Sequence, residues 1–230
     1  MQKREKIVDL IQSVQLDREV TVMGWIRSFR NDRFIALNDG STIKTLQVVI
    51  DQENEDFALL KRFTVGAAIK ATGRIIESQG KGQSVELVAE TLVVLGDCDA
   101  DKYPLQPKKH SLEFLRDIAH LRVRTNTFSA VFRIRHAVTF AIHKFFNDKG
   151  FYNVHSPIIT GSDAEGAGEM FQVTTMDMNS IPLGEDGKVD YKQDFFGKAT
   201  NLTVSGQLQA ELAALGLSQV YTFGPTFRAE

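Results

Sequence analysis

The sequence has little cysteine and proline, almost no net charge and no long hydrophobic run. Its 230 residues include one cysteine, Cys98, which excludes an internal disulfide and agrees with a reducing cytosol. No apolar run approaches the roughly 20 residues that span a bilayer, and the first residues, MQKREKIVDLIQ, lack a signal-peptide cleavage site. We therefore expect a cytoplasmic protein without a membrane partner. The formal net charge of −2 neither favours nor excludes a nucleic-acid partner.

Several catalytic signatures are also missing. The chain has no GxxxxGK[ST] phosphate loop, no GxSxG nucleophile elbow, no HExxH motif and no cysteine pair. Its 5 histidines include no pair at metal-ligand spacing, so we expect no metal site within this chain. These absences exclude P-loop nucleotide hydrolases, α/β hydrolases and the common zinc enzymes.

Residues 1–100 have the pattern of a small β-barrel. Short runs rich in β-branched and aromatic residues alternate with polar turns, and a helical stretch lies between the third and fourth runs. The runs are EVTVMGWI, RFIALND, TLQVVID, AAIKATGRII and VELVAETLVVL, and the helical stretch carries Phe57, Leu60 and Phe63. Three strands, a helix and two strands is the order of an oligonucleotide-binding (OB) barrel. We expect an all-β OB-fold domain, with a lead-in helix at residues 5–14 packed on its outside.

A linker and a mixed α+β region follow. Residues 98–110, CDADKYPLQPKKH, hold two of the chain's 5 prolines and a run of charges, so we expect a linker or hinge over residues 101–125. The apolar residues Phe128, Val131, Ile134, Val138, Ile142 and Phe145 recur at helical spacing, which predicts one long helix that Gly150 ends. The strand-like segment FYNVHSPIIT contains Pro157, which belongs at a sheet edge, a bulge or a strand entrance.

Four further features complete residues 126–230. They are the acidic loop SDAEGAGE, the alternating run FQVTT, the strand–helix segment NLTVSGQLQAELAALGL and the strand-like run SQVYTFGPTFRAE. With the barrel before them, these features resemble class II aminoacyl-tRNA synthetases of the aspartyl, asparaginyl and lysyl subgroup. The helix 128–149 with the strand to Pro157 resembles motif 1, the dimer interface of this family, and the closing FRAE resembles the FRxE start of motif 2. The resemblance implies an α+β class II catalytic domain, an antiparallel sheet with helices, that is incomplete here.

The resemblance implies an asparagine–tRNA ligase, which activates asparagine as the adenylate and transfers it to tRNA(Asn). Attack of a carboxylate on the α-phosphorus of ATP brings two anions together, and a guanidinium can bind both. By the resemblance, Arg228 is this catalytic group, and Glu230 contacts the adenine amino group or holds the motif 2 loop. Glu165 would bind the α-ammonium group of asparagine as the acidic loop closes. ATP and Mg²⁺ are the implied cofactors, and the implied assembly is a homodimer with Pro157 at its interface.

The residues that select the substrate are also implied. Aspartyl members of the subgroup carry Ser-x-Gln followed three residues later by a lysine that pairs with the substrate's side-chain carboxylate. Here Ser205 and Gln207 match the first two positions, and Ala210 stands at the lysine position. Without that cation the pocket suits a neutral amide, because a buried carboxylate would be uncompensated. Apart from any family, Ser205 is also expected to cap a helix over residues 206–215.

On the barrel, the resemblance implies the anticodon-binding residues. Phe34 occupies the position where the family stacks the middle anticodon base, a uridine for asparagine, aspartate and lysine tRNAs. Gln47 matches the amide that recognises the edge of this base, and Arg27 on the first strand is expected near the same face. These residue types suit the task, because unpaired bases need aromatic faces to stack on and polar groups along their edges.

Two alternatives stay open. The first is an aspartate-charging, non-discriminating relative, and Ala210 argues against it. The second is a non-catalytic tRNA-binding or single-strand-binding protein, which is favoured by the lack of a match to the family's third motif and its ATP-binding arginine. We expect the 230-residue chain to be the N-terminal part of a larger enzyme or a truncated product that does not complete adenylation alone.

Overall fold

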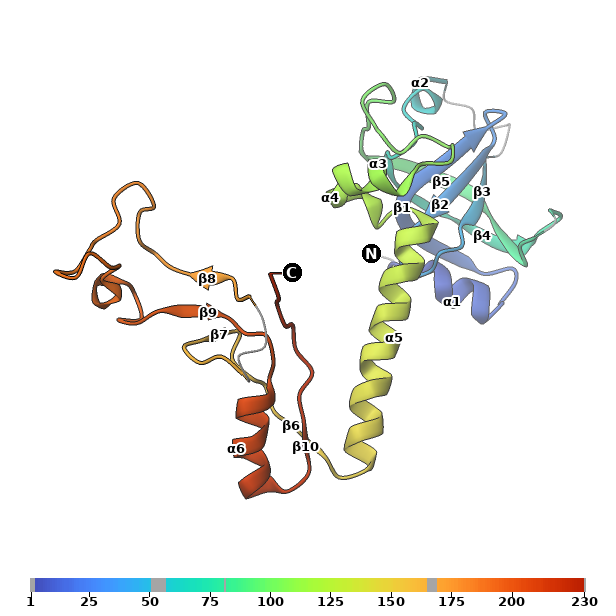
Figure 1. The fold of residues 1–230 in the computed structure, drawn as a ribbon. Helices are drawn as coiled ribbons and strands as arrows, with labels where there is room; N and C mark the ends of the chain where they lie inside the picture. Colours follow the sequence, from blue (N-terminus) through green and yellow to red (C-terminus); the bar gives the residue numbers. More distant parts are fainter. Residues whose placement is uncertain (1–2, 51–56, 81, 165–168, 230) are drawn as a thin grey trace. The chain divides into compact units, whose positions relative to one another are not determined.

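The computed structural model describes residues 3–50, 57–80, 82–164 and 169–229. The chain divides into two units, Met1–Arg135 and His136–Glu230, which are described separately. The first unit contains, in order, α1 (Ile7–Gln12), β1 (Glu19–Arg30), β2 (Phe34–Asn38), β3 (Leu46–Ile50), α2 (Phe57–Leu60), β4 (Ala68–Glu77), β5 (Val85–Gly96), α3 (Leu112–Asp117) and α4 (Ala119–Arg122) (Figure 1).

The five strands close into a barrel in the order β1-β2-β3-β5-β4. The long strand β1 pairs with β2 along its second half and with β4 along its first half, and both ladders are antiparallel. The ladder between β3 and β5 is parallel. Three strands, a helix and two strands closed in this order confirm the predicted OB barrel.

Alternating side chains of the strands fill the barrel. The fully buried core residues of the strands include Val20, Val22, Ile26, Ile35, Leu37, Leu46, Val48, Ile69, Ala71, Ile75, Val85 and Leu87. The lead-in helix contributes Ile7 and Leu10 to the same buried cluster, so α1 is part of the core and does more than cover the outside. Because alternate residues point inward, the residues between them stand on the outer face of the barrel.

A buried carboxylate attaches α1 to the turn after β2. Asp39 accepts hydrogen bonds from the backbone N–H of Ile7 at 3.0 Å and from the backbone N–H and hydroxyl of Ser41 at 2.9 and 2.6 Å. Burial alone would raise the pKa of Asp39, but the hydrogen bonds from Ser41 and Ile7 and the charge of Arg4 together lower it. The ionised form of Asp39 therefore stabilises the folded barrel.

The segment after the barrel packs back on it. The Thr64 hydroxyl donates to the carbonyl of Cys98 at 2.5 Å, and Leu105 and Leu115 are buried. Ser111 caps α3, because its hydroxyl accepts the N–H of Phe114 at 3.2 Å. The residues expected to form a linker thus lie in the first unit and contribute apolar side chains to it.

The long helix α5 (Asn126–Asp148) leads into the second unit. It confirms the predicted helix, and Gly150 has φ +83°, the left-handed conformation of a glycine that follows a helix. The second unit then contains β6 (Tyr152–Asn153), β7 (Ile159–Thr160), β8 (Gln172–Val173), η2 (Tyr191–Gln193), β9 (Thr200–Leu202), α6 (Gln207–Leu217) and β10 (Val220–Tyr221). The sheet β7-β9-β8 is antiparallel, and β10 pairs with β6 in parallel.

The segment around Pro157 is two strands and not one. Before the proline, β6 pairs with β10, and the N–H of Val154 donates to the carbonyl of Tyr221 at 2.9 Å. After it, β7 pairs with β9, and the carbonyl of Ile158 accepts the N–H of Thr203 at 2.8 Å. Pro157, which has no N–H to donate, lies where the chain passes from one partner to the other, at the entrance to β7.

The closing run SQVYTFGPTFRAE forms a shorter strand than its alternation predicts. Its regular ladder is confined to β10, and the following residues make single backbone hydrogen bonds to other segments. The cause is pairing, because β6 offers only two residues to β10.

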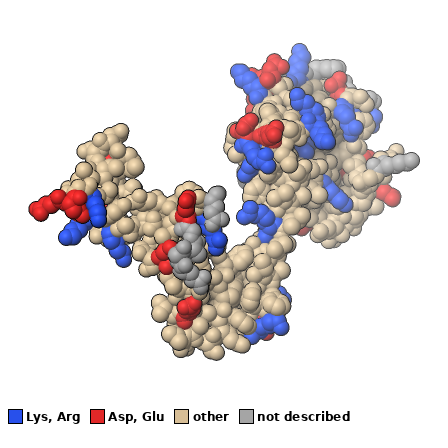
Figure 2. Space-filling view, viewed as in Figure 1, with Lys and Arg blue, Asp and Glu red and all other residues tan. Residues whose placement is uncertain are grey.

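Many large apolar side chains of the second unit are exposed. None of the residues of α5 is buried, and the exposed fractions of Phe140, Leu212 and Leu215 are 65%, 70% and 88%. Figure 2 shows few charged side chains around α6. Among the described residues, no helix combines the length and apolar composition that crossing a membrane requires.

A first prediction concerns the closure of the barrel. A Cβ atom on Gly73 would lie 2.0 Å from the backbone oxygen of Val88, so the two paired strands would have to separate. We expect Gly73→Ala to destabilise the barrel by about 1–3 kcal/mol in urea unfolding monitored by the fluorescence of Trp25, the only tryptophan. Gly80→Ala is the control, because its nearest contact would be an ordinary 3.5 Å. Equal stability of the two variants would contradict the close approach.

A second prediction concerns pH. Because the pKa of Asp39 is lowered in the folded state, the stability that it contributes is present at neutral pH and is lost as pH falls through the folded value. Between about pH 5 and about pH 3, the wild-type barrel should therefore lose more stability than Asp39→Asn, measured as the urea midpoint of Trp25 fluorescence. Asp101→Asn serves as the exposed control. Parallel losses in the wild type and Asp39→Asn would contradict this role.

Candidate functional site

Phe34 and Gln47 share the outer face of the barrel. In the β2–β3 ladder, Phe34 is opposite Val49 and Ala36 is opposite Gln47, while Ile35 between them is fully buried. Phe34 and Gln47 are thus diagonal neighbours across two strands, a separation that long and aromatic side chains can bridge. The structure brings together the two residues that were expected to recognise one base.

The Gln47 side chain is oriented by a buried carboxylate. Its Nε2 donates to Glu86 Oε2 at 2.9 Å, and the Ser78 hydroxyl donates to the same oxygen at 3.2 Å. Glu86 is 8% exposed and lies directly opposite Gln47 in the β3–β5 ladder. One amide hydrogen of Gln47 is therefore occupied, and its Oε1 and second hydrogen remain for a base edge.

A cationic side chain lies over the ring of Phe34. The guanidinium carbon of Arg33 lies 5.5 Å from the ring centroid, and Phe34 is half-buried. A partly exposed aromatic ring beside an arginine is the combination that binds unpaired bases by stacking and phosphates by charge.

The Arg27 side chain makes its hydrogen bonds to residues at the start of α5. It lies at an irregularity of β1, between Ile26 and Ser28. Its Nη1 donates to the carbonyl of Arg124 at 2.8 Å and its Nη2 to Asn126 Oδ1 at 3.3 Å. Burial lowers the pKa of Arg27 from its usual value. Arg27 therefore connects the barrel to the start of α5, in addition to the anticodon role that remains a prediction.

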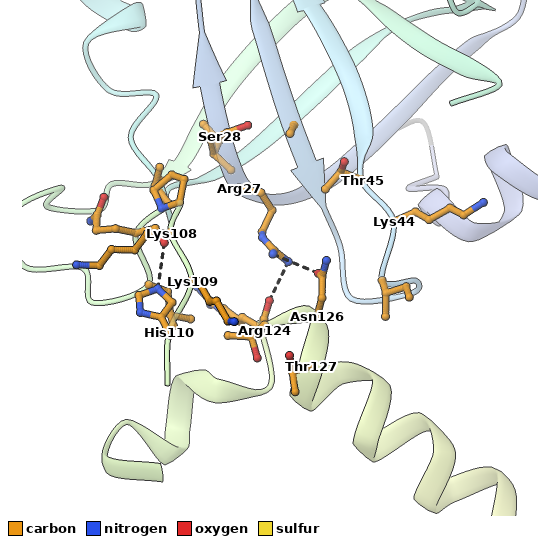
Figure 3. A pocket seen from close by; sticks show the side chains of 18 of the residues that line it. Arg27, Ser28, Lys44, Thr45, Lys108, Lys109, His110, Arg124, Asn126 and Thr127 are labelled. Atoms are coloured by element: carbon orange, nitrogen blue, oxygen red, sulfur yellow. Dashed lines mark hydrogen bonds between the residues drawn. The ribbon is translucent and has the colours of Figure 1, made fainter. Parts of the chain in front are cut away.

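A cavity of about 1470 Å³ adjoins this face within the first unit. Figure 3 shows Arg27 and Ser28 from β1, Lys44 and Thr45 from the loop before β3, and residues of the segment after the barrel around it. Ala36, the cross-strand partner of Gln47, also lines the cavity, so the cavity and the Phe34–Gln47 face are continuous.

In the second unit, the Ser-x-Gln segment begins α6. The Ser205 hydroxyl accepts the backbone N–H of Gln207 at 3.0 Å, and Gly206 between them is the N-cap residue. The helix begins one residue later than the predicted 206–215, so Ser205 precedes the N-cap residue, and its hydroxyl still accepts the N–H of the first helical residue. Gln207 Nε2 donates to Glu211 at 2.9 Å, and Ala210 stands on the first turn of α6.

Gly206 allows three segments to meet beside Ser205. A Cβ atom there would lie 2.9 Å from the Ser156 hydroxyl and 3.1 Å from the side chain of Thr222. A larger residue would push apart the segment of Pro157, the start of α6 and the segment that follows β10. Gly206 is itself buried, as this contact requires.

Arg228 is held next to the same segment by its neighbours. The N–H of Phe227 donates to the carbonyl of Thr203 at 2.9 Å, and the N–H of Ala229 donates to the carbonyl of Glu169 at 2.8 Å. Thr203 is two residues before Ser205, so the backbone next to the predicted catalytic arginine is hydrogen-bonded to the strand end that leads into the predicted substrate-selecting residues. No local sequence pattern indicates this pairing, because it joins two irregular segments.

Two predicted residues lie outside the described residues. These two are Glu165, which is expected to bind the α-ammonium group, and Glu230, which is expected to lie near adenine. Glu169, whose carbonyl binds Ala229, closely follows Glu165 in the chain. Both roles stay predictions.

Pro157 and the apolar stripe of α5 are exposed in this chain. Pro157 precedes β7, and Ile134 and Val138 of the stripe are 62% and 50% exposed. An exposed apolar helix face fits the expected subunit interface, which also stays a prediction.

No metal centre is formed by the part of the chain that the structure covers. Among the described residues, no group of three or more His, Cys, Asp or Glu side chains is placed to hold an ion.

Two groups of residues in the site are not indicated by the sequence pattern. Glu86, like Glu90, is an acidic residue within the strand-like run VELVAE, and its role follows from its register with Gln47. The cationic residues Lys108 and Lys109 were assigned to a linker from their composition, and only packing places them around the cavity.

Comparisons with curated proteins find close relatives. The chain is 58% identical over 233 residues to the asparagine–tRNA ligase of Cytophaga hutchinsonii, a match that covers 99% of this chain and 50% of the relative. It is 57% identical over 230 residues to the asparagine–tRNA ligase of Bacteroides fragilis, covering 99% and 49%. The chain thus spans about half the length of the curated relatives that it matches.

Solved structures share the fold. The asparaginyl-tRNA synthetase of Pyrococcus horikoshii, solved with asparaginyl-adenylate, matches with a TM-score of 0.78 at 22% identity, covering 100% of this chain and 49% of that one. The asparaginyl-tRNA synthetase of Entamoeba histolytica matches with a TM-score of 0.78 at 20% identity, covering 100% and 49%. These matches confirm an OB barrel followed by part of a class II synthetase catalytic domain.

Two family models match different parts of the chain. Residues 20–95 match the OB-fold nucleic acid binding domain, and residues 111–230, just over half of the chain, match tRNA synthetases class II (D, K and N). The first agrees with the closed barrel described above. The chain belongs to the class II tRNA synthetases of the D, K and N group.

Proposed function

We propose that this chain is the tRNA-recognising and first catalytic part of an asparagine–tRNA ligase. The enzyme activates asparagine with ATP to asparaginyl-adenylate and transfers it to tRNA(Asn). The observation that supports the proposal is the hydrogen bond from the N–H of Phe227, next to Arg228, to the carbonyl of Thr203, two residues before Ser205. The high identity to curated asparagine–tRNA ligases along the whole chain supports it.

Arg228 would stabilise the activation step. The carboxylate of the amino acid and the α-phosphate of ATP repel each other as they approach, and a guanidinium can donate to oxygens of both. The backbone hydrogen bonds of Phe227 and Ala229 restrict the position of Arg228, so less reorganisation is needed when the substrates bind. Glu230 would contact adenine, and Glu165 would bind the ammonium group of asparagine.

Selection of asparagine rests on Ala210. A lysine one turn after Gln207 would attract the carboxylate of aspartate, and Ala210 provides no charge at that position. The side-chain amide of asparagine can hydrogen-bond to Ser205 and Gln207 without compensation by a cation. An aspartate-charging, non-discriminating enzyme is therefore the less favoured alternative.

The barrel would bind the anticodon. The middle uridine would stack on Phe34, beside Arg33, and present its edge to Gln47. Glu86 holds Nε2 of Gln47, which leaves Oε1 to accept the N3–H of uracil. Arg27 would contact a neighbouring nucleotide from the cavity.

The proposal extends to organisation and surroundings. Residues 1–100 would form the anticodon-binding domain, 101–125 the hinge and 126–230 the first part of the catalytic domain. The exposed face of α5 with Pro157 would meet a second copy in a cytoplasmic homodimer. Activation of an amino acid by ATP, with release of pyrophosphate, would use Mg²⁺. The described residues offer no cluster for the ion, so no step is assigned to it.

Charging assays test the proposal. The native-length protein should attach asparagine to tRNA(Asn) and should not attach aspartate to tRNA(Asn) or tRNA(Asp). Charging of aspartate to both tRNAs would favour the non-discriminating alternative. Binding of tRNA(Asn) with no charging of any amino acid would favour the non-catalytic alternative.

A third prediction tests Arg228. Arg228→Ala in the native-length protein should lower asparagine-dependent ATP–pyrophosphate exchange at least about 100-fold, because the transition-state charge loses its donor. Binding of tRNA(Asn) should change less than about twofold, since the barrel is untouched. Arg116→Ala, on α3, is the charge-matched control. Exchange that equals the control would remove Arg228 from the activation step.

A fourth prediction tests the stacking platform. Phe34→Ala in the 230-residue chain should weaken binding of tRNA(Asn) by about 1–3 kcal/mol, the usual contribution of one base–aromatic stack. Phe195→Ala, an aromatic residue of the second unit that is 77% exposed, should leave affinity unchanged. Filter binding at one salt concentration measures both, with Trp25 fluorescence as the check of folding. An unchanged affinity for Phe34→Ala would refute the anticodon assignment.

A further inference from the structure

The cavity beside the barrel is lined by charge of one sign. Its cationic side chains are Arg27 and Arg30 from β1, Lys44 from the loop before β3, and Lys108, Lys109 and Arg124 from the segment after the barrel. No Asp or Glu is among the described residues that line it. Figure 2 shows Lys and Arg side chains on the face of the barrel unit. A hollow surrounded by a single sign of charge concentrates the electrostatic potential and attracts the opposite charge.

Within the part of the chain that the structure describes, no ion pair joins these cations to a carboxylate. The ion pairs of the described residues involve Arg4, Arg18, Arg62, Lys102 and Lys144, none of which lines the cavity. Arg27 donates to two neutral oxygens, and the Arg124 guanidinium lies 4.9 Å from the Trp25 ring centroid. Arg27 and Arg124 are half-buried, whereas Arg30, Lys44, Lys108 and Lys109 are exposed. Cations gathered in one hollow repel one another, and a bound anion would relieve this repulsion.

The start of α5 adds to the positive potential. Asn126 and Thr127, the first residues of this 23-residue helix, line the cavity (Figure 3). The N-terminal end of a helix carries a partial positive charge, which adds to that of Arg124 and Arg27 nearby. The polar groups at this end therefore support an anionic ligand and not a cationic or apolar one.

The size and position of the cavity identify the anion. Its volume of about 1470 Å³ exceeds the roughly 300–1,000 Å³ of pockets for small molecules. It opens beside Ala36, the cross-strand neighbour of Gln47, so a nucleic-acid strand whose base lies on Phe34 would bring its next phosphates into the cavity. Six cations spread over the cavity suit a chain of phosphodiesters better than a single phosphate.

We propose that residues 103–127 form the second wall of an RNA-binding groove whose first wall is the barrel. Lys108 and Lys109 contact the phosphates of the strand that continues from the bases held on the barrel face. Arg27 holds the two walls together through Arg124 and Asn126. The groove rests on the proposed tRNA binding, and it extends the nucleic-acid surface past residues 20–95, the part that matches the OB-fold model.

The test is the salt dependence of RNA binding. The Lys108→Ala, Lys109→Ala double variant of the 230-residue chain is compared with the wild type on a tRNA(Asn) transcript between about 50 and about 200 mM salt. The slope of log K against log salt is negative, and each lost phosphate contact should make it shallower by about 0.7–0.9. The loss of two contacts should therefore reduce its magnitude by about 1.4–1.8. Discrimination against a transcript with a changed middle anticodon base should stay within about twofold, because phosphate contacts carry no base identity.

The matched control removes two charges elsewhere on the same unit. Lys61→Ala, Lys102→Ala changes two exposed lysines that do not line the cavity, and its slope should equal that of the wild type. A slope for Lys108→Ala, Lys109→Ala equal to that of this control would overturn the groove. A wild-type chain that binds RNA without recognising the anticodon would contradict the proposed function, yet a smaller slope for the double variant would still support the groove. No RNA binding by the wild type would overturn both.

Discussion

The candidate base-recognising side chains depend on the closure of the five-stranded barrel. The strand β1 is long enough to pair with both β2 and β4, so the sheet has no free edge and each strand has one inner and one outer face. Ile35 and Leu37 point into the core, which forces Phe34 and Ala36 outward. The register with β3 then places Gln47 beside them, and the parallel ladder to β5 places Glu86 beside Gln47.

The second unit is organised in another way. Its predicted site is assembled from single backbone hydrogen bonds between irregular segments, such as those of Phe227 and Ala229, and from the close contact at Gly206. Ala164 and Val204 are the only buried apolar side chains of that unit among the described residues, whereas Leu212 and Leu215 are exposed. This shortage of burial agrees with a chain that spans about half the length of its curated relatives, and with the proposed contact of α5 with a second copy.

The parts of the fold that local pattern controls could be predicted from the sequence. Alternation of apolar residues predicted the barrel strands, and the stripe from Phe128 to Phe145 with Gly150 predicted α5. Pairing between distant residues could not be predicted. The division of the Pro157 segment depends on hydrogen bonds of Val154 to Tyr221 and of Thr203 to Ile158, which no local pattern contains.

The candidate site shows the same division. Phe34, Gln47 and the Ser205–Gln207 segment were predicted because each occupies a position in a motif, and the structure brings each group together. Glu86 and the wall formed by Lys108 and Lys109 were missed, because their roles follow from register and packing. Composition predicts a linker over this charged, proline-containing segment, and the burial of its Leu105 and Leu115 follows only from packing.

The central claim is that the barrel face recognises the middle anticodon base of tRNA(Asn). The most direct measurement is the affinity of the 230-residue chain for two tRNA(Asn) transcripts that differ only in that base, uridine in one and cytidine in the other, at one salt concentration. The account predicts at least about tenfold weaker binding of the cytidine transcript, since the wrong edge meets Gln47 while every phosphate contact is kept. Equal affinities would contradict it.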